Sequence, residues 1–195
     1  MTTCECMVWD TTGPVYASAC GHLAWLLDAA GTEKRHLIPS VVAEEMSALG
    51  VPLPADADGG VEIIDCEAFT ELEDFAALAA WMEVLGTDLE AGHNVGEAFT
   101  AFIAAREEHS VAIVDDRDAT SAIRSRRDSA VEVRGVLWAI SRGVFEDRAA
   151  GPNAYSGLCD AMLNAQKGTL RPLRWPCERG GYPTWFEKNR AALAR

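Results

Sequence analysis

Apolar residues in the first 145 positions occur either in short runs or at helical spacing. Short apolar runs that predict buried strands occupy residues 6–9, 36–39, 61–64, 111–114 and 131–133. Between these runs, recurrence every three or four positions predicts helices over residues 15–27, 41–49, 72–85, 94–109, 118–127 and 136–142. Strands that alternate with helices in this way are typical of βαβ units. We therefore predict an α/β fold, specifically a three-layer α/β/α sandwich with a mainly parallel central sheet.

The alternating pattern loosens towards the C-terminus. Helices are predicted over residues 155–166 and from Pro183 onward, separated by a stretch rich in Pro, Arg and Trp. We expect one main domain over residues 1–150 and a C-terminal helical extension, residues 151–195, packed on it. Within the main domain, Ser40 has the short hydroxyl side chain that favours the N-cap position of the helix after it.

Charge is unevenly distributed along the 195 residues. The chain has 17 Lys and Arg against 30 Asp and Glu, a net charge of −13, and the first 100 residues hold 2 basic and 18 acidic residues. This balance excludes a protein that coats nucleic acid through a broad basic surface, but not an enzyme whose acids bind metal ions. The six cysteines form no C-x2-C pair, and neither a basic-apolar leader nor a membrane-length apolar run is visible. We expect a cytoplasmic protein with reduced thiols.

Acidic residues follow two of the predicted strands. Asp10 follows residues 6–9, and Asp115, Asp116 and Asp118 follow residues 111–114. Ligands of open α/β sheets bind beyond the carboxyl ends of the strands, where the strand order reverses. If these two strands are neighbours, their carboxylates meet there and repel one another unless a cation lies between them. Oxygen ligands without an accompanying Cys/His set favour Mg²⁺ or Mn²⁺ over zinc.

Two further acids lie on helices that can reach the same edge of the sheet. Glu45 is on the helix after Pro39, and Glu97 opens the helix that begins near Asn94. The histidines share no metal-ligand spacing, and neither a glycine-rich phosphate loop nor a nucleophilic Ser or Cys motif is present, which excludes nucleoside triphosphatases and acyl hydrolases.

Five short motifs, in order along residues 6–145, resemble those of the PIN domain family. They are residues 8–12 (Val-Trp-Asp-Thr-Thr), 38–45 (Ile-Pro-Ser-Val-Val-Ala-Glu-Glu), 96–98 (Gly-Glu-Ala), 113–119 (Ile-Val-Asp-Asp-Arg-Asp-Ala) and 133–137 (Val-Arg-Gly-Val-Leu). The resemblance implies a PIN-like fold and a metal-dependent ribonuclease, most often the toxin of a bacterial toxin–antitoxin pair. The long loop over residues 50–60, the helix after it and the C-terminal extension depart from a minimal toxin of this family.

The resemblance also implies roles for individual residues. Asp10, Glu45, Glu97 and Asp116 match the four acidic positions of the family, and Asp118 matches a frequent fifth. We expect Asp10 and Asp116 to bind Mg²⁺ or Mn²⁺ directly, and Glu97 and Asp118 to bind it directly or through water. We expect Glu45 to orient or activate the attacking water. Thr12, Arg117 and Arg124 are expected to contact the substrate, with Arg126 and Arg127 as further candidates for flanking phosphates. The role of Asp115 stays open.

Alternative functions remain at this point. The expected function is an endoribonuclease acting on RNA, with an antitoxin protein as its partner, and the resemblance allows a homodimer. The first alternative is a catalytically silent PIN-like module that docks a protein partner. The second is another Mg²⁺-dependent phosphotransfer fold. Such folds need an acid cluster directly after the first strand, whereas the paired acids of this chain are at positions 115 and 116, so this alternative is disfavoured.

Overall fold

The computed structural model describes most of the predicted main domain. It covers residues 6–19, 23–31, 34–51, 60–127, 129–145, 187–189 and 191. Except for the helical residues 187–189 and 191, the predicted extension, including the predicted helix over residues 155–166, lies outside the described residues.

The described strands form one five-stranded parallel sheet, as the alternating pattern predicts. They are β1 (Cys6–Trp9), β2 (Arg35–Pro39), β3 (Val61–Ile64), β4 (Ser110–Ile113) and β5 (Glu132–Arg134). Their order across the sheet is β3-β2-β1-β4-β5, and all four neighbouring pairs are parallel. The strand order therefore reverses between β1 and β4, where Trp9 is paired with Ile113.

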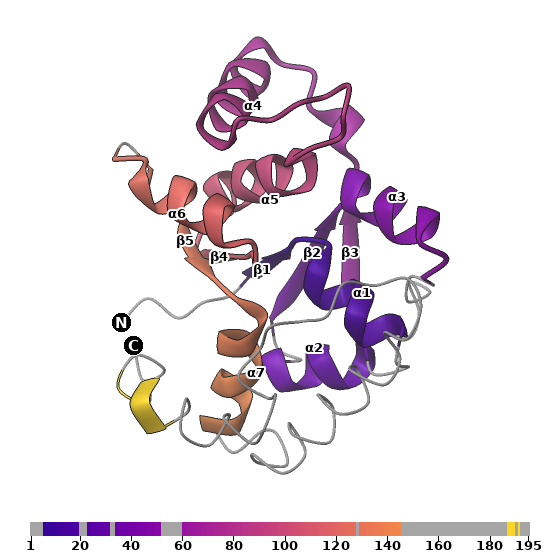
Figure 1. Ribbon diagram of the computed structural model, residues 1–195, viewed down its shortest axis with the longest axis vertical. Helices are drawn as coiled ribbons and strands as arrows, with labels where there is room; N and C mark the ends of the chain where they lie inside the picture. The colour runs from indigo at the N-terminus through magenta and orange to yellow at the C-terminus, as the bar shows by residue number, and fades with distance from the viewer. Residues whose placement is uncertain are drawn as a thin grey trace.

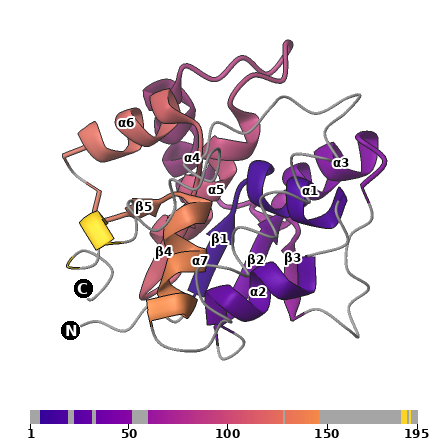
Figure 2. The same ribbon diagram turned by 60° about the horizontal axis from the view of Figure 1, so that its bottom comes forward.

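Helices cover both faces of this sheet and complete the three-layer sandwich (Figure 1). On one face lie α1 (Thr12–Ala19), α2 (Leu23–Gly31) and α7 (Val136–Phe145), and on the other lie α4 (Leu72–Leu85), α5 (Val95–Arg106) and α6 (Arg117–Ser125). Helix α3 (Ser40–Ala48) contacts β2, β3 and α5, and a short 3-10 turn, η1 (Cys66–Ala68), precedes α4. Figure 2 shows α7 in front of β4 and α2 in front of β1 and β2, and the two helices contact each other. In the described ranges, no helix is long and apolar enough to cross a bilayer.

Alternating side chains of β1 divide the core into two clusters. Met7 and Trp9 pack among α1, α2 and α7, whereas Cys6 and Val8 pack under α5. All four side chains are at most 2% exposed, because successive residues of a strand point to opposite faces and helices cover both. Burial on both faces explains why β1 is a continuous apolar run.

Two local predictions were wrong. The helical pattern over residues 15–27 is two helices, one ending at Ala19 and the next beginning at Leu23. Ser40 is not the N-cap of α3, because Pro39 occupies that position and makes no side-chain capping bond. The Ser40 hydroxyl instead accepts a hydrogen bond of 3.1 Å from the backbone N–H of Cys66, which links α3 to η1.

Candidate metal centre

The first acid of the candidate centre lies where the strand order reverses. The backbone N–H of Asp10 donates to the carbonyl of Ile113 at 3.0 Å, so that Asp10 remains attached to the β1–β4 ladder. The N–H of Val114, the first residue after β4, donates to the carbonyl of Arg134 on β5 at 2.8 Å. The residues that follow β1 and β4 therefore leave the sheet at the same edge, as predicted for Asp10 and Asp115. Asp10 is only 4% exposed.

Gly96 allows α5 to approach Asp10 closely. A Cβ atom at position 96 would lie 3.1 Å from Oδ1 of Asp10 and 3.2 Å from Cγ2 of Val42. These separations are shorter than ordinary van der Waals contacts, so a side chain here would push the first turn of α5 away from β1. The glycine of the Gly96-Glu97 motif thus brings the half-buried Glu97 to the same edge.

Glu45 reaches this edge from α3, and a neighbouring threonine fixes its orientation. The hydroxyl of Thr11 donates a hydrogen bond to Oε2 of Glu45. The sequence-based interpretation assigned Thr12 to the substrate and gave Thr11 no role; Thr12 is half-buried in the first turn of α1. Thr11 therefore has a positioning role that the sequence analysis missed, although both threonines directly follow Asp10.

The two acids at the end of β4 are helix caps. Oδ1 of Asp116, the N-cap of α6, accepts a hydrogen bond of 2.7 Å from the N–H of Ala119. Oδ1 of Asp115 accepts a hydrogen bond of 3.0 Å from the N–H of Val136, at the start of α7. Carboxylates at helix N-termini satisfy N–H groups that have no partner within the helix. The cap on α6 occupies one oxygen of Asp116 and leaves the second for another contact.

A substitution at Gly135 tests the cap formed by Asp115. A Cβ atom at position 135 would lie 2.6 Å from Oδ1 of Asp115, too close for the carboxylate to stay in place. We expect Gly135→Ala to lower the free energy of unfolding by about 2 kcal/mol, the upper range for a lost N-cap. Chemical denaturation measures this change.

The same substitution in an Asp115→Ala background is the control. Without the carboxylate there is no clash, so the added methyl group should be neutral or slightly stabilising. Equal losses in both backgrounds would contradict this account of Gly135.

Burial and crowding of negative charge raise the pKa values of two acids. Burial first, and then the charges of Glu97, Glu45 and Asp115, raise the pKa of Asp10 well above its ordinary value, opposed by a hydrogen bond from the backbone of Thr11. Burial is also the main cause of the raised pKa of Glu97, with further contributions from Glu45 and Asp116. The backbone N–H of Glu97 and the electrostatic effect of His93 lower the pKa of Glu97. The five acids thus interact electrostatically.

The cluster of these five acids has the donor chemistry of a hard-cation site, although its side chains are not gathered around one point. In the described part of the chain, no three Asp, Glu, His or Cys side chains lie close enough together to hold a metal ion as they stand. Asp118 is exposed in the first turn of α6, and it is not among the acids with the largest effects on the pKa of Asp10 or Glu97. Asp115, by contrast, is one of the acids that raise the pKa of Asp10. The structure therefore associates Asp10 more closely with Asp115 than with Asp118.

Two of the predicted substrate-binding residues line a cavity next to the acids. This cavity of about 470 Å³ is lined by Val114, Asp115, Arg117, Thr120, Ser121, Arg124 and Gly135. Nη2 of Arg124 donates to the carbonyl of Val133 at 3.1 Å, which holds the guanidinium beside β5. Positive side chains therefore adjoin the acids on the α6 side.

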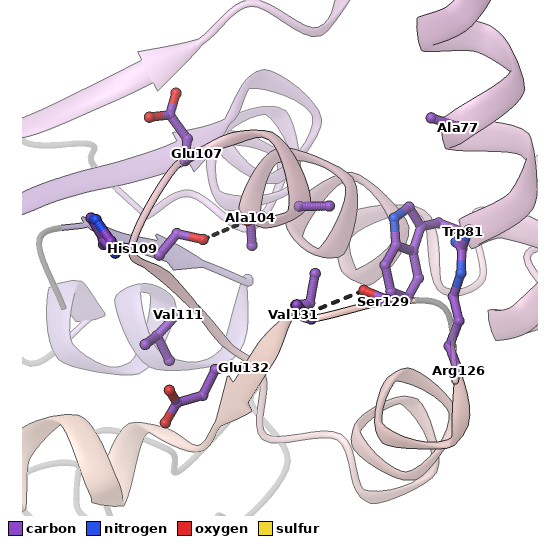
Figure 3. A pocket seen from close by; sticks show the side chains of 13 residues that line it. Ala77, Trp81, Ala104, Glu107, His109, Val111, Arg126, Ser129, Val131 and Glu132 are labelled. Atoms are coloured by element: carbon purple, nitrogen blue, oxygen red, sulfur yellow. Dashed lines mark hydrogen bonds between the residues drawn. The ribbon is translucent and has the colours of Figure 1, made fainter. Parts of the chain in front are cut away.

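A larger cavity, of about 550 Å³, lies at the opposite edge of the sheet (Figure 3). It opens at the amino ends of β4 and β5, beside α4 and α5, and Arg126 stacks on Trp81 at its wall with 4.2 Å between the guanidinium carbon and the ring centroid. Arg126, a predicted candidate for phosphate binding, therefore lies away from the acids.

Comparison with known proteins identifies no family for this chain. No protein-family model, no curated protein and no solved structure matches it.

Proposed function

We propose that this chain is a PIN-type endoribonuclease that hydrolyses RNA with Mg²⁺ or Mn²⁺. The observation that supports this proposal best is the electrostatic interaction of Asp10, Glu45 and Glu97, from three separate segments, with Asp115 and Asp116 near the point where the strand order reverses. The first four of the five motifs that resemble the PIN family supply these acids in the expected order.

The donor set fits a hard divalent cation. All its ligands are carboxylate oxygens, which Mg²⁺ and Mn²⁺ prefer. Burial and, after it, neighbouring carboxylates raise the pKa values of Asp10 and Glu97. Among the main contributors, His93 is the one side chain that lowers either pKa. A cation would relieve this repulsion and draw the carboxylates towards one another.

Each residue has a distinct role in the proposed site. Asp10, Glu97 and the second oxygen of Asp116 would hold the cation, with Asp118 at the rim acting through water. When bound, the cation would lower the pKa of a water molecule and would stabilise the negative charge of the non-bridging phosphate oxygens. Glu45, fixed by Thr11, orients the water that attacks the phosphorus.

The basic side of the cavity would bind the substrate. Arg117 and Arg124 lie on the α6 wall next to the acids, where guanidinium groups can pair with a phosphate upstream or downstream of the cleaved bond. Thr12, in the first turn of α1, would contact the substrate from the other side of Asp10. In this proposal the enzyme is a cytoplasmic toxin whose antitoxin is a separate protein, and homodimerisation is compatible with it.

A catalytically silent binding module is the second candidate. It is favoured by the structural use of two acids, because Asp115 and Asp116 cap α7 and α6. The dispersed arrangement of the acids in the described residues also favours it.

Cleavage of a labelled single-stranded RNA with Mn²⁺ or with EDTA separates the two candidates. We expect cleavage with Mn²⁺ only, and a reduction of about a hundredfold in kcat/KM for Glu45→Gln, the loss typical when a water-orienting carboxylate is neutralised. Glu44→Gln is the matched control, because Glu44 is the exposed neighbour on the same helix and should retain wild-type activity. Binding of Mn²⁺ without RNA cleavage would favour the silent module.

A further inference from the structure

The outer face of α4 exposes apolar side chains in a continuous stripe. Leu72 is 82% exposed and Phe75 is 56% exposed, and Ala76 and Ala79 are exposed beside them. Residues at this spacing lie on one side of a helix. Figure 1 shows α4 as the outermost helix, above α5. No described element covers its outer side. We call these four residues the α4 stripe.

The opposite side of α4 is fixed to the domain. Trp81 and Leu85 are buried against α5, and Asp74 forms an ion pair with Arg106 at the end of α5. The guanidinium of Arg106 also lies over Phe69 and Phe102, 5.3 and 5.5 Å from the ring centroids. Because these contacts use the inner side of α4, the helix cannot rotate to bury the α4 stripe without breaking them.

Negative charge surrounds the α4 stripe. Residues 60–93 contain nine Asp and Glu and neither Lys nor Arg. Glu71, Glu73 and Glu83 are exposed on α4 itself or immediately before it. An exposed apolar stripe inside an acidic rim is complementary to a surface that is apolar at its centre and basic at its edges.

We propose that the α4 stripe docks a basic amphipathic helix of a partner protein. Leu72 and Phe75 would insert between apolar side chains of the partner helix, and the small Ala76 and Ala79 let the two helix axes approach closely. Lys or Arg residues beside the apolar face of the partner would lie against Glu71, Glu73 and Glu83. The same acidic rim disfavours RNA or DNA as the occupant. It also disfavours a second copy of this chain, since a symmetric dimer would place like charges opposite each other.

This docking surface is separate from the acidic cluster. The first turns of α4 lie beside Arg106, at the last turn of α5, whereas Glu97 is in the first turn of α5. A partner on the α4 stripe would therefore leave Asp10 and Glu97 accessible. The inference is independent of the proposed nuclease activity and does not fail with it.

A synthetic peptide tests the charge and shape of the proposed partner. The probe is a fluorescein-labelled helix of about 18 residues, long enough to be helical, with leucine on one face and lysine on the other. A second peptide carries glutamate in place of lysine. We expect the lysine peptide to raise the fluorescence anisotropy with the full chain at micromolar concentration, more weakly at high salt, and the glutamate peptide not to bind.

Variants locate the binding site of the peptide. Leu72→Ser with Phe75→Ser should weaken binding at least about tenfold, because anchors at the centre of an interface dominate its affinity. The matched control, Leu49→Ser, changes a side chain that is 52% exposed at the end of α3 and should bind the peptide as the wild type does. Circular dichroism verifies that both variants are folded.

Three outcomes would overturn the proposal. The first is equal binding of the lysine peptide to the wild type and the double variant, because the acidic cluster or another surface would then be the site. The second is no binding to the wild type, which would mean that another segment of the chain covers the stripe. The third is a dimer in sedimentation experiments that Leu72→Ser and Phe75→Ser dissociate, which would identify a second copy as the occupant.

Discussion

Replacement of Asp10 by Asn is expected to abolish Mn²⁺-dependent RNA cleavage and to leave the metal-free protein at least as stable as the wild type. Asp10 is the most buried acid of the cluster, and its charge is opposed by burial and by Glu97, Glu45 and Asp115. Asn keeps the size of the side chain but removes a metal-binding charge. A loss of about 4 kcal/mol of transition-state stabilisation corresponds to about a thousandfold in rate, and we expect at least this reduction in kcat/KM.

The stability of the same variant distinguishes a lost ligand from a damaged fold. Removal of an unfavourable buried charge should keep or raise the melting temperature without metal, whereas disruption of the fold would lower it. Asp28→Asn, on the exposed side of α2, is the control and should change neither activity nor stability. Full activity of Asp10→Asn would exclude Asp10 as a metal ligand and would contradict the proposed nuclease site.

Much of the fold follows from apolar spacing. The predicted bounds 61–64 and 72–85 coincide with β3 and α4, because an abrupt change from turn residues to apolar residues marks both ends of each. Apolar spacing alone does not mark a break between two helices with similar buried faces, so α1 and α2 were predicted as one. Ser40 was predicted as a cap from residue type, but the hydrogen bond to Cys66 depends on a contact 26 residues along the chain.

The part of the candidate site that lies at the ends of strands was predictable from the sequence. Asp10 and the acids after β4 follow directly from the strand pattern, and the pairing of Trp9 with Ile113 places their strands side by side. Which threonine contacts Glu45 depends on backbone angles in the turn after β1, which residue types do not determine. The cap from Asp115 to α7 joins positions 21 residues apart and could be suspected only from Gly135, whose missing side chain makes room for the carboxylate.

The raised pKa of Asp10 also predicts how stability depends on pH. A carboxyl group whose pKa is higher in the folded state than in the unfolded chain binds more protons when folded, over the range between the two values. Stability therefore falls as the pH rises from about 4, the ordinary carboxyl range, towards the raised folded-state pKa. Each unit of difference in pKa corresponds to about 1.4 kcal/mol, or about 3–6 °C in melting temperature for a domain of this size.

Metal binding should reverse this loss, because a cation takes the place of the protons between the carboxylates. In EDTA, the melting temperature should fall by several degrees between pH 5 and pH 7.5, whereas Mn²⁺ at about a hundred times its Kd should add about 2.7 kcal/mol at the higher pH. The melting temperature of Asp10→Asn should depend less on pH and respond less to Mn²⁺. Thermal denaturation of both proteins at the two pH values measures all three effects. Parallel curves for the wild type and Asp10→Asn would assign the pH dependence to the overall net charge of −13 instead of to the buried carboxylate.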